Sequence, residues 1–117
     1  ELMKDQTADL VKEAEVHKTE GNRFFADGKF EDALASYQKA AEPFMGYDAA
    51  GLDASAKKFL AAVCSNSAQA YLNLEGSARS IAGALAMAEK ALSFEPTNTK
   101  ARFRRGCAHV RGCDLNL

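Results

Sequence analysis

The feature that most constrains this chain is a small residue followed three positions later by a ring, which occurs three times. The three pairs are Gly21 and Phe24, Ala68 and Tyr71, and Gly106 and His109. Residues three apart lie on one face of a helix, so each pair places a small side chain beside a ring on the same face. A motif that recurs in successive segments indicates internal repeats. We therefore expect a short array of similar helical units.

A second set of small residues follows the first two pairs. Its members keep offsets of four and three in both units: Ala33, Tyr37 and Ala40, then Ala84, Ala88 and Ala91. Small side chains at such positions let two helices approach closely, while larger neighbours fill the space alongside. Each unit is thus predicted to be a pair of antiparallel helices. The residues expected at helix–helix contacts are Gly21, Ala33, Ala68, Ala84, Ala88 and Gly106.

Apolar periodicity predicts five helices and no strand. Apolar residues recur at steps of three and four over about 8–26, from 30 past 41, over 53–74, over about 80–94, and from 99 to 110 or beyond. Asp53 is the expected N-cap of the third helix, and Asp27-Gly28 and Pro96 end helices through their turn chemistry. Of 117 residues, 23 are Ala, which has the highest helix propensity, so the composition favours the same all-α class.

Together these motifs resemble the tetratricopeptide repeat, a 34-residue helix–turn–helix unit with small and ring residues at these places and a proline at its end. The resemblance covers about 14–112 and implies a right-handed superhelix of antiparallel helix pairs. Within a single domain spanning 1–117, we expect full repeats at 14–43 and 61–96, a long connection at 43–60, and the first helix of a third repeat at 99–112. The uncovered apolar stripe of that last helix suggests a piece of a longer protein, and leaves self-association through it open.

The first helices of such units line the concave surface, and here they carry a distinctive polar set. Lys18 and Asn22 lie four apart on the first, Asn66 lies on the second, and Lys100 and Arg104 lie four apart on the third. Three cations and two amides brought together from three helices favour an anion held by directional hydrogen bonds. These five residues are the predicted binding set for an anion.

The same residue types at the same repeat positions are similar to the carboxylate clamp of tetratricopeptide co-chaperones. The resemblance implies a cytoplasmic interaction module that binds the C-terminal Glu-Glu-Val-Asp of heat-shock protein 90 or heat-shock protein 70. The chain looks most like the immunophilin-type co-chaperones, whose peptidyl-prolyl isomerase domain lies upstream of the repeats and outside these residues, so no enzymatic activity is predicted. Further groove contacts are expected at Phe25, Gln69, Leu72 and Asn73. Many such clamps carry Lys where this chain has Asn73.

Other function classes find little support in the sequence. A net charge of −1 provides no basic field for nucleic acid, although 100–111 holds five basic residues. No apolar run approaches the ~20 residues of a membrane span. Three cysteines without CxxC spacing, and two histidines at packing positions, predict no metal or cofactor. Two alternatives stay open: a generic repeat scaffold that binds another peptide or a partner helix in its concave groove, and an oligomerisation surface on the fifth helix.

Overall fold

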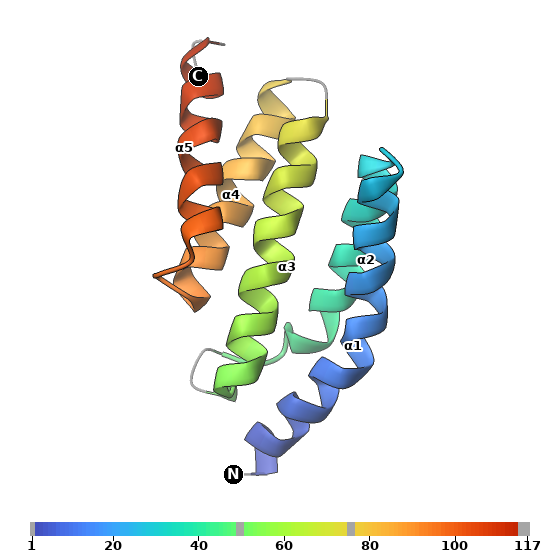
Figure 1. The fold of residues 1–117 in the computed structure, drawn as a ribbon. Helices are drawn as coiled ribbons and strands as arrows, with labels where there is room; N and C mark the ends of the chain where they lie inside the picture. The colour runs from blue at the N-terminus through green and yellow to red at the C-terminus, as the bar shows by residue number, and fades with distance from the viewer. Residues whose placement is uncertain (1, 49–50, 75–76, 115–117) are drawn as a thin grey trace.

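The computed structural model describes residues 2–48, 51–74 and 77–114, with side chains from residue 9 to residue 113 of these ranges (Figure 1). In chain order the elements are α1 (Leu2–Ala26), α2 (Phe30–Ala41), the short 3₁₀ helix η1 (Glu42–Phe44), α3 (Ala54–Asn73), α4 (Ala78–Phe94) and α5 (Thr99–Asp114). None of the described residues forms a strand. The predicted all-α class is confirmed.

Side-chain caps begin three of the helices. The Asp53 carboxylate accepts a hydrogen bond from the backbone N–H of Ala56 at 2.8 Å and starts α3, as predicted. The Ser77 hydroxyl accepts from the N–H of Ser80 at 3.2 Å and starts α4 slightly earlier than the periodicity indicates. Asn98 plays the same part ahead of α5 by accepting from Ala101 at 2.8 Å. Such caps satisfy N–H groups that have no partner within the helix.

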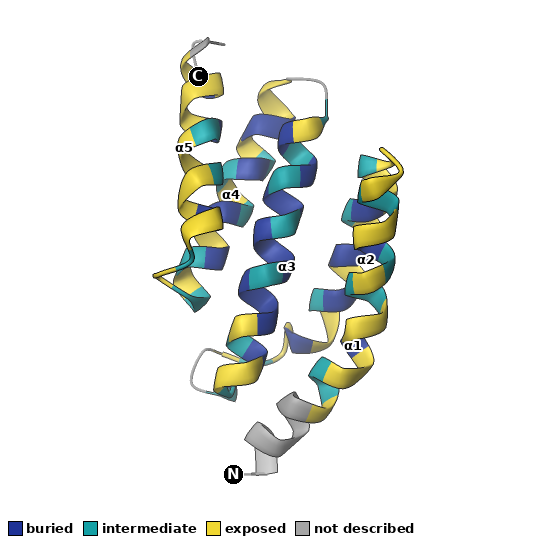
Figure 2. Cartoon of the chain, viewed as in Figure 1, coloured by how far each residue is buried: buried dark blue, intermediate teal, exposed yellow. Residues whose placement is uncertain are grey.

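Consecutive helices pack as antiparallel pairs. α1 packs on α2, α3 packs on α4, and α5 packs on both α4 and α3. In Figure 1 α1, α3 and α5 run in the same direction on the near side, with α2 and α4 behind them. One face of the molecule is therefore built from first helices and the other from second helices. Figure 2 shows that α3, at the centre, is the most continuously buried helix.

Glycine contacts show how closely the helices of each pair approach. A Cβ on Gly21 of α1 would lie 2.6 Å from the ring of Tyr37 on α2, and one on Gly83 of α4 would lie 2.7 Å from the ring of Tyr71 on α3. In both pairs a tyrosine ring rests on a glycine of the partner helix. Only hydrogen fits at these positions, because the rings lie well inside van der Waals contact of any side chain.

The predicted small-residue contacts are confirmed with one exception. Ala33, Ala68, Ala84 and Ala88 have no exposed surface, and Gly21 is buried. Gly106 is exposed, and a Cβ built there would meet nothing within 4 Å, so its expected helix contact is wrong. The reason is that no described helix covers this face of α5.

The long connection is packed rather than free. Phe44 of η1 and Leu52 are buried in the same cluster as Phe59 of α3, and the rings of Phe44 and Phe59 lie 5.9 Å apart. This cluster closes the end of the first helix pair against α3. Leu72 is 5% exposed and packs with Ile81, Ala84 and Ala108 in a separate cluster. The structure thus corrects the expectation that Leu72 contacts a ligand in the groove.

Candidate anion-binding site

A cavity of about 250 Å³ opens on the face built from α1, α3 and α5. The side chains around it come from four helices: Asn22 and Phe25 of α1, Tyr37 of α2, Asn66 and Gln69 of α3, and Arg104 of α5. Three residues of the predicted binding set and two of the expected groove contacts therefore line one cavity. No Asp or Glu is among the lining residues, so none of the residues that line the cavity repels an anion.

Asn22 is oriented by two neighbours. Its Oδ1 accepts a hydrogen bond from the Tyr37 hydroxyl at 2.6 Å and another from Nδ2 of Asn66 at 3.1 Å. With Oδ1 occupied on the protein side, the Nδ2 amino group is the part of Asn22 free to face a ligand as a donor. Sequence reasoning missed this role for Tyr37, since its position in the repeat indicated only packing.

The Tyr37 hydroxyl stays a neutral donor. The side chain is 1% exposed, and burial raises the pKa of its hydroxyl, an effect that the nearby Arg104 charge opposes. The ring packs closely against Gly21, since a Cβ built on Gly21 would lie 2.6 Å from it. The small residue one position before Asn22 therefore helps to aim the amide.

Arg104 reaches across from α5 and is held by α3. Its Nη1 donates to the carbonyl oxygen of Ser65 at 2.8 Å and to the Ser65 hydroxyl at 2.6 Å, and its Nε donates to Oε1 of Gln69 at 3.2 Å. Burial lowers the pKa of Arg104, opposed by Tyr37 and Cys107, but a guanidinium is charged at any physiological pH. None of the hydrogen bonds among the described side chains uses Nη2 of Arg104.

Gln69 and Asn73 extend this network along α3. Nε2 of Gln69 donates to Oδ1 of Asn73 at 2.6 Å, while Oε1 of Gln69 accepts from Arg104. Asn73 does not line the cavity. Asn73 is connected to the cavity through Gln69. Gln69 and Asn73 therefore form a hydrogen-bonded pair of neutral amides beside the guanidinium of Arg104.

The two lysines of the predicted set lie one helical turn before Asn22 and Arg104. Lys18 is half-buried, with its Nζ 5.8 Å from the centroid of the Phe59 ring, and Lys100 is exposed. Neither lines the cavity. Because α1 and α5 run in the same direction (Figure 1), each lysine precedes the cavity residue of its own helix on the same side.

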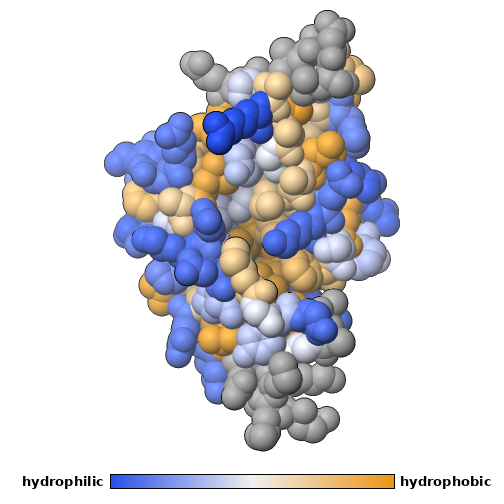
Figure 3. Space-filling model, turned by 180° about the vertical axis from the view of Figure 1, so that it is seen from behind, coloured by the Kyte–Doolittle hydropathy of each residue, from blue (hydrophilic) through white to orange (hydrophobic). Residues whose placement is uncertain are grey.

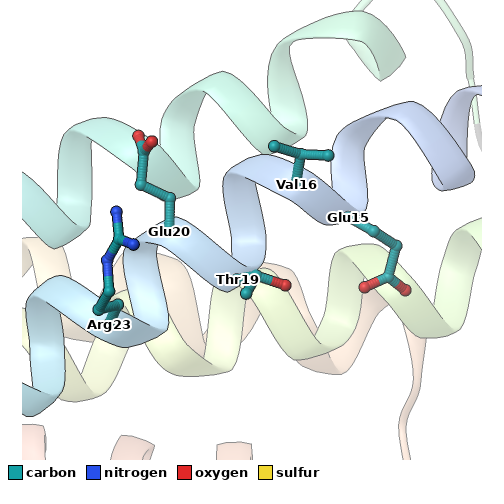
Figure 4. Close-up of a pocket in the computed structure, with 5 residues that line it drawn as sticks. All are labelled: Glu15, Val16, Thr19, Glu20 and Arg23. Atoms are coloured by element: carbon teal, nitrogen blue, oxygen red, sulfur yellow. The ribbon is translucent and has the colours of Figure 1, made fainter.

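A second hollow on α1 does not have these properties. It measures about 400 Å³ and is lined by Glu15, Val16, Thr19, Glu20 and Arg23 (Figure 4). All five belong to one helix, charges of both signs are present, and Glu20 already accepts a hydrogen bond from Ser36 at 3.0 Å. Side chains from a single helix do not converge on a ligand as the cavity residues do.

The described residues offer no metal site. They contain no group of three or more His, Cys, Asp and Glu side chains placed to hold a metal ion. Within the same residues, no helix is long and apolar enough to cross a membrane. All three cysteines are free thiols, and burial raises the pKa of Cys64 to about 11, opposed by Lys90.

The chain is similar to known proteins over most of its length. No family model matches the sequence. The chain is 28% identical over 114 residues to the peptidyl-prolyl cis-trans isomerase FKBP4 of Mus musculus, which covers 95% of this chain and 24% of that protein. FKBP4 of Bos taurus is 29% identical over 110 residues, covering 92% of this chain and 23% of its own length. The chain thus spans about a quarter of the length of these relatives.

A solved structure shares the arrangement of helices. It is described as the first TPR of Spaghetti (RPAP3) bound to the HSP90 peptide SRMEEVD. It matches with a TM-score of 0.68 at 26% sequence identity, and the match covers 91% of this chain and 72% of that chain. The likeness therefore extends over nearly all of the present chain.

Proposed function

We propose that this chain, which has the tetratricopeptide-repeat fold, is a non-enzymatic binding module for the C-terminal Glu-Glu-Val-Asp tail of heat-shock protein 90 in the cytoplasm. The tail of heat-shock protein 70 has the same terminal chemistry and is a second ligand of the same site. The terminal Asp lies in the cavity lined by α1, α3 and α5. Isomerase activity, which the relatives' name states for those proteins, is not proposed for these 117 residues.

One observation carries the proposal: amide and guanidinium donors from three helices converge on a cavity without a carboxylate. A C-terminal Asp presents two carboxylates, and each needs several donors once it leaves water. Nδ2 of Asn22, the amide of Asn66 and Nη2 of Arg104 supply directional bonds, while Lys18 and Lys100 supply charge. Support also comes from the structural neighbour, which is itself bound to a peptide ending in Glu-Val-Asp.

The donors are aimed before a ligand arrives. Tyr37 orients Asn22, and Ser65 and Gln69 hold Arg104 through hydrogen bonds of 2.6–3.2 Å. Side chains fixed in advance lose less rotamer freedom on binding, so more of each charge-assisted bond appears as affinity. Farther along the groove the amide of Asn73 stands where many clamps carry Lys. We therefore expect a firm grip on the terminal Asp and a weak grip on the upstream Glu.

The test is calorimetry with the peptide Met-Glu-Glu-Val-Asp and two matched variants. We expect a micromolar Kd, on the order of −7 to −8 kcal/mol. Arg104→Ala removes charge-assisted bonds of about 1.5–3 kcal/mol each and should weaken binding by tenfold or more. Arg105→Ala removes the same charge from an exposed neighbour that does not line the cavity, and should change Kd by less than about twofold. Equal losses in both variants would show a diffuse attraction instead of a site.

A further inference from the structure

The face opposite the anion site carries a second concave surface, between α2 and α4. A cavity of about 460 Å³ lies there, and a neighbouring one of about 550 Å³ shares Glu31 and Tyr71 with it. The two are therefore parts of one continuous groove, which we call the α2–α4 groove. Its floor is α3 and its walls are α2 and α4; its main lining residues are Leu34, Met45, Val63, Tyr71, Met87 and Lys90.

The groove exists because α2 and α4 both pack on α3 and hardly on each other. Small side chains line part of the space, namely Ala35 and Ala41 on α2 and Ser67 on α3. None of them is long enough to bridge the two walls. Figure 3, which views the molecule from this side, shows an apolar hollow bordered by hydrophilic side chains.

Flexible apolar side chains reach solvent along this groove. Met45 is 64% exposed, and Leu34 and Met87 are half-buried. Methionine adapts its shape to different apolar partners and is common on surfaces that bind helices. A continuous apolar hollow with a polar border on a small domain is typical of a protein interaction site.

The charged residues of the groove are divided between its walls. Glu31 is the charged lining residue of the α2 wall, whereas Lys90 and Arg79 lie on the α4 wall. Among the lining residues, the α2 border thus carries a carboxylate and the α4 border carries two cations. A partner complementary to both needs opposite charges on its two flanks, with an apolar stripe between them.

We propose that the α2–α4 groove binds one amphipathic helix of another protein, with acidic residues on the flank facing α4 and basic residues on the flank facing α2. An extended segment is disfavoured because helical walls offer no free backbone groups to pair with it, whereas a helix satisfies its own. α2 has 12 residues and spans about 18 Å. The groove therefore accommodates a helix of about three turns, with apolar residues at i, i+3 and i+7.

This site is independent of the anion-binding cavity. Tyr37 is shared by the linings of both, but its hydroxyl points to Asn22 on the other face. A chaperone tail and a helical partner can therefore bind at the same time. The proposal stands whether or not the tail is the ligand of the first site.

The probe is a peptide of about 14 residues, acetylated and amidated, with Leu at i, i+3, i+7 and i+10, Glu along one flank and Lys along the other. Amidation keeps it out of a site that needs a free carboxylate. Methyl NMR should show saturable shifts at Met45 and Met87, with a Kd on the order of 10–100 µM. Ala35→Lys, at an exposed position of α2 in the groove, puts a cation beside the Lys flank of the peptide and should weaken binding at least fivefold; the matched control Ala86→Lys, exposed on α4 outside the lining, should not.

A second peptide, with its two charged flanks exchanged, distinguishes specific binding from non-specific hydrophobic adsorption. We expect it to bind at least fivefold more weakly than the first peptide, because it places Glu beside Glu31 and Lys beside Lys90. Equal affinities of the two peptides, or equal affinities for wild type and Ala35→Lys, would overturn the proposal. So would shifts of the two methionine methyls on dilution without peptide, since the occupant would then be a second copy of the chain.

Discussion

The proposed anion site has two parts, one on α1 and one on α5, which we call its two arms. They are alike in sequence but are held in place in different ways. α1 carries Lys18 and Asn22, and α5 carries Lys100 and Arg104, in each case a cation one turn before a side chain that lines the cavity. The α1 arm is supported from its own repeat, because the ring of Tyr37 on α2 packs against α1 and bonds Asn22. This support arises from close packing of a helix pair.

The α5 arm is supported from the neighbouring repeat instead. Arg104 is held by Ser65 and Gln69 of α3, and Arg111 donates to the carbonyl oxygen of Leu72 on the same helix. The outer face of α5 is open, with Phe103 71% exposed. The orientation of α5 therefore depends on polar bonds to α3 and on packing against α4. The same sequence motif is thus held by helix packing in one arm and by hydrogen bonds in the other.

The largest loss of stability should come from a substitution in the α1 arm, which is held by helix packing. Gly21→Ala puts a Cβ 2.6 Å from the buried Tyr37 ring, so the α1–α2 pair must separate. Overpacking of this kind costs roughly 1–3 kcal/mol, which exceeds the gain of up to about 1 kcal/mol in helix propensity. Thermal or urea unfolding should show a net loss of stability. Unchanged stability would mean that α1 and α2 are not in close contact at this position.

A smaller effect is expected when the ring stays and its hydroxyl is removed. Tyr37→Phe leaves the packing intact but deprives Asn22 of a 2.6 Å hydrogen bond, which is worth about 0.5–1.5 kcal/mol. Peptide affinity should also fall, by about threefold to tenfold on the same scale, because Asn22 is no longer held in one orientation. Tyr47→Phe, away from the cavity, is the control. Loss of stability without loss of affinity would contradict the positioning role.

The open arm should respond to the equivalent glycine change with the opposite sign. Gly106→Ala places a Cβ where nothing lies within 4 Å, so only the helix propensity changes. The substitution should stabilise the chain by up to about 1 kcal/mol. Unfolding curves measured beside those of Gly21→Ala give the comparison directly. Destabilisation by Gly106→Ala would indicate that another surface covers α5.

The smallest effect on stability is expected when one of the hydrogen bonds that hold Arg104 is removed. Gln69→Met removes the acceptor for Nε and the donor to Asn73, while Ser65 still binds Nη1. Stability should change by less than about 0.5 kcal/mol, because the site is partly exposed. Peptide affinity should fall about twofold to fivefold, since the guanidinium is less well oriented. Asn73→Ala should give a smaller loss of peptide affinity. An increase in affinity would show that the Gln69–Asn73 hydrogen bond does not help to orient Arg104.

Much of the fold was predictable, because it depends on spacing. The small residues of each pair and the Asp53 cap follow from local rules, and the structure has them where expected. Asn22, Asn66 and Arg104 meet at one cavity because first helices share a face, which the repeat register already implies.

The remaining features depend on contacts that spacing does not encode. Leu72 lies near the end of α3, where the packing of α4 and α5 turns its side chain into the core. Gly106 carries the same motif as Gly21 but has no covering helix among the described residues. The bonds of Tyr37 to Asn22 and of Gln69 to Asn73 depend on side-chain rotamers, which follow from three-dimensional packing.

The central claim, that the site grips a terminal Asp, is tested most directly by titrating one peptide in two forms. Calorimetry compares Met-Glu-Glu-Val-Asp with a free C-terminal carboxylate against the same peptide amidated at its C-terminus. Amidation removes one of two anions and leaves every side chain, so we predict micromolar binding for the acid and at least tenfold weaker binding for the amide. Equal affinities for the two forms would contradict the account.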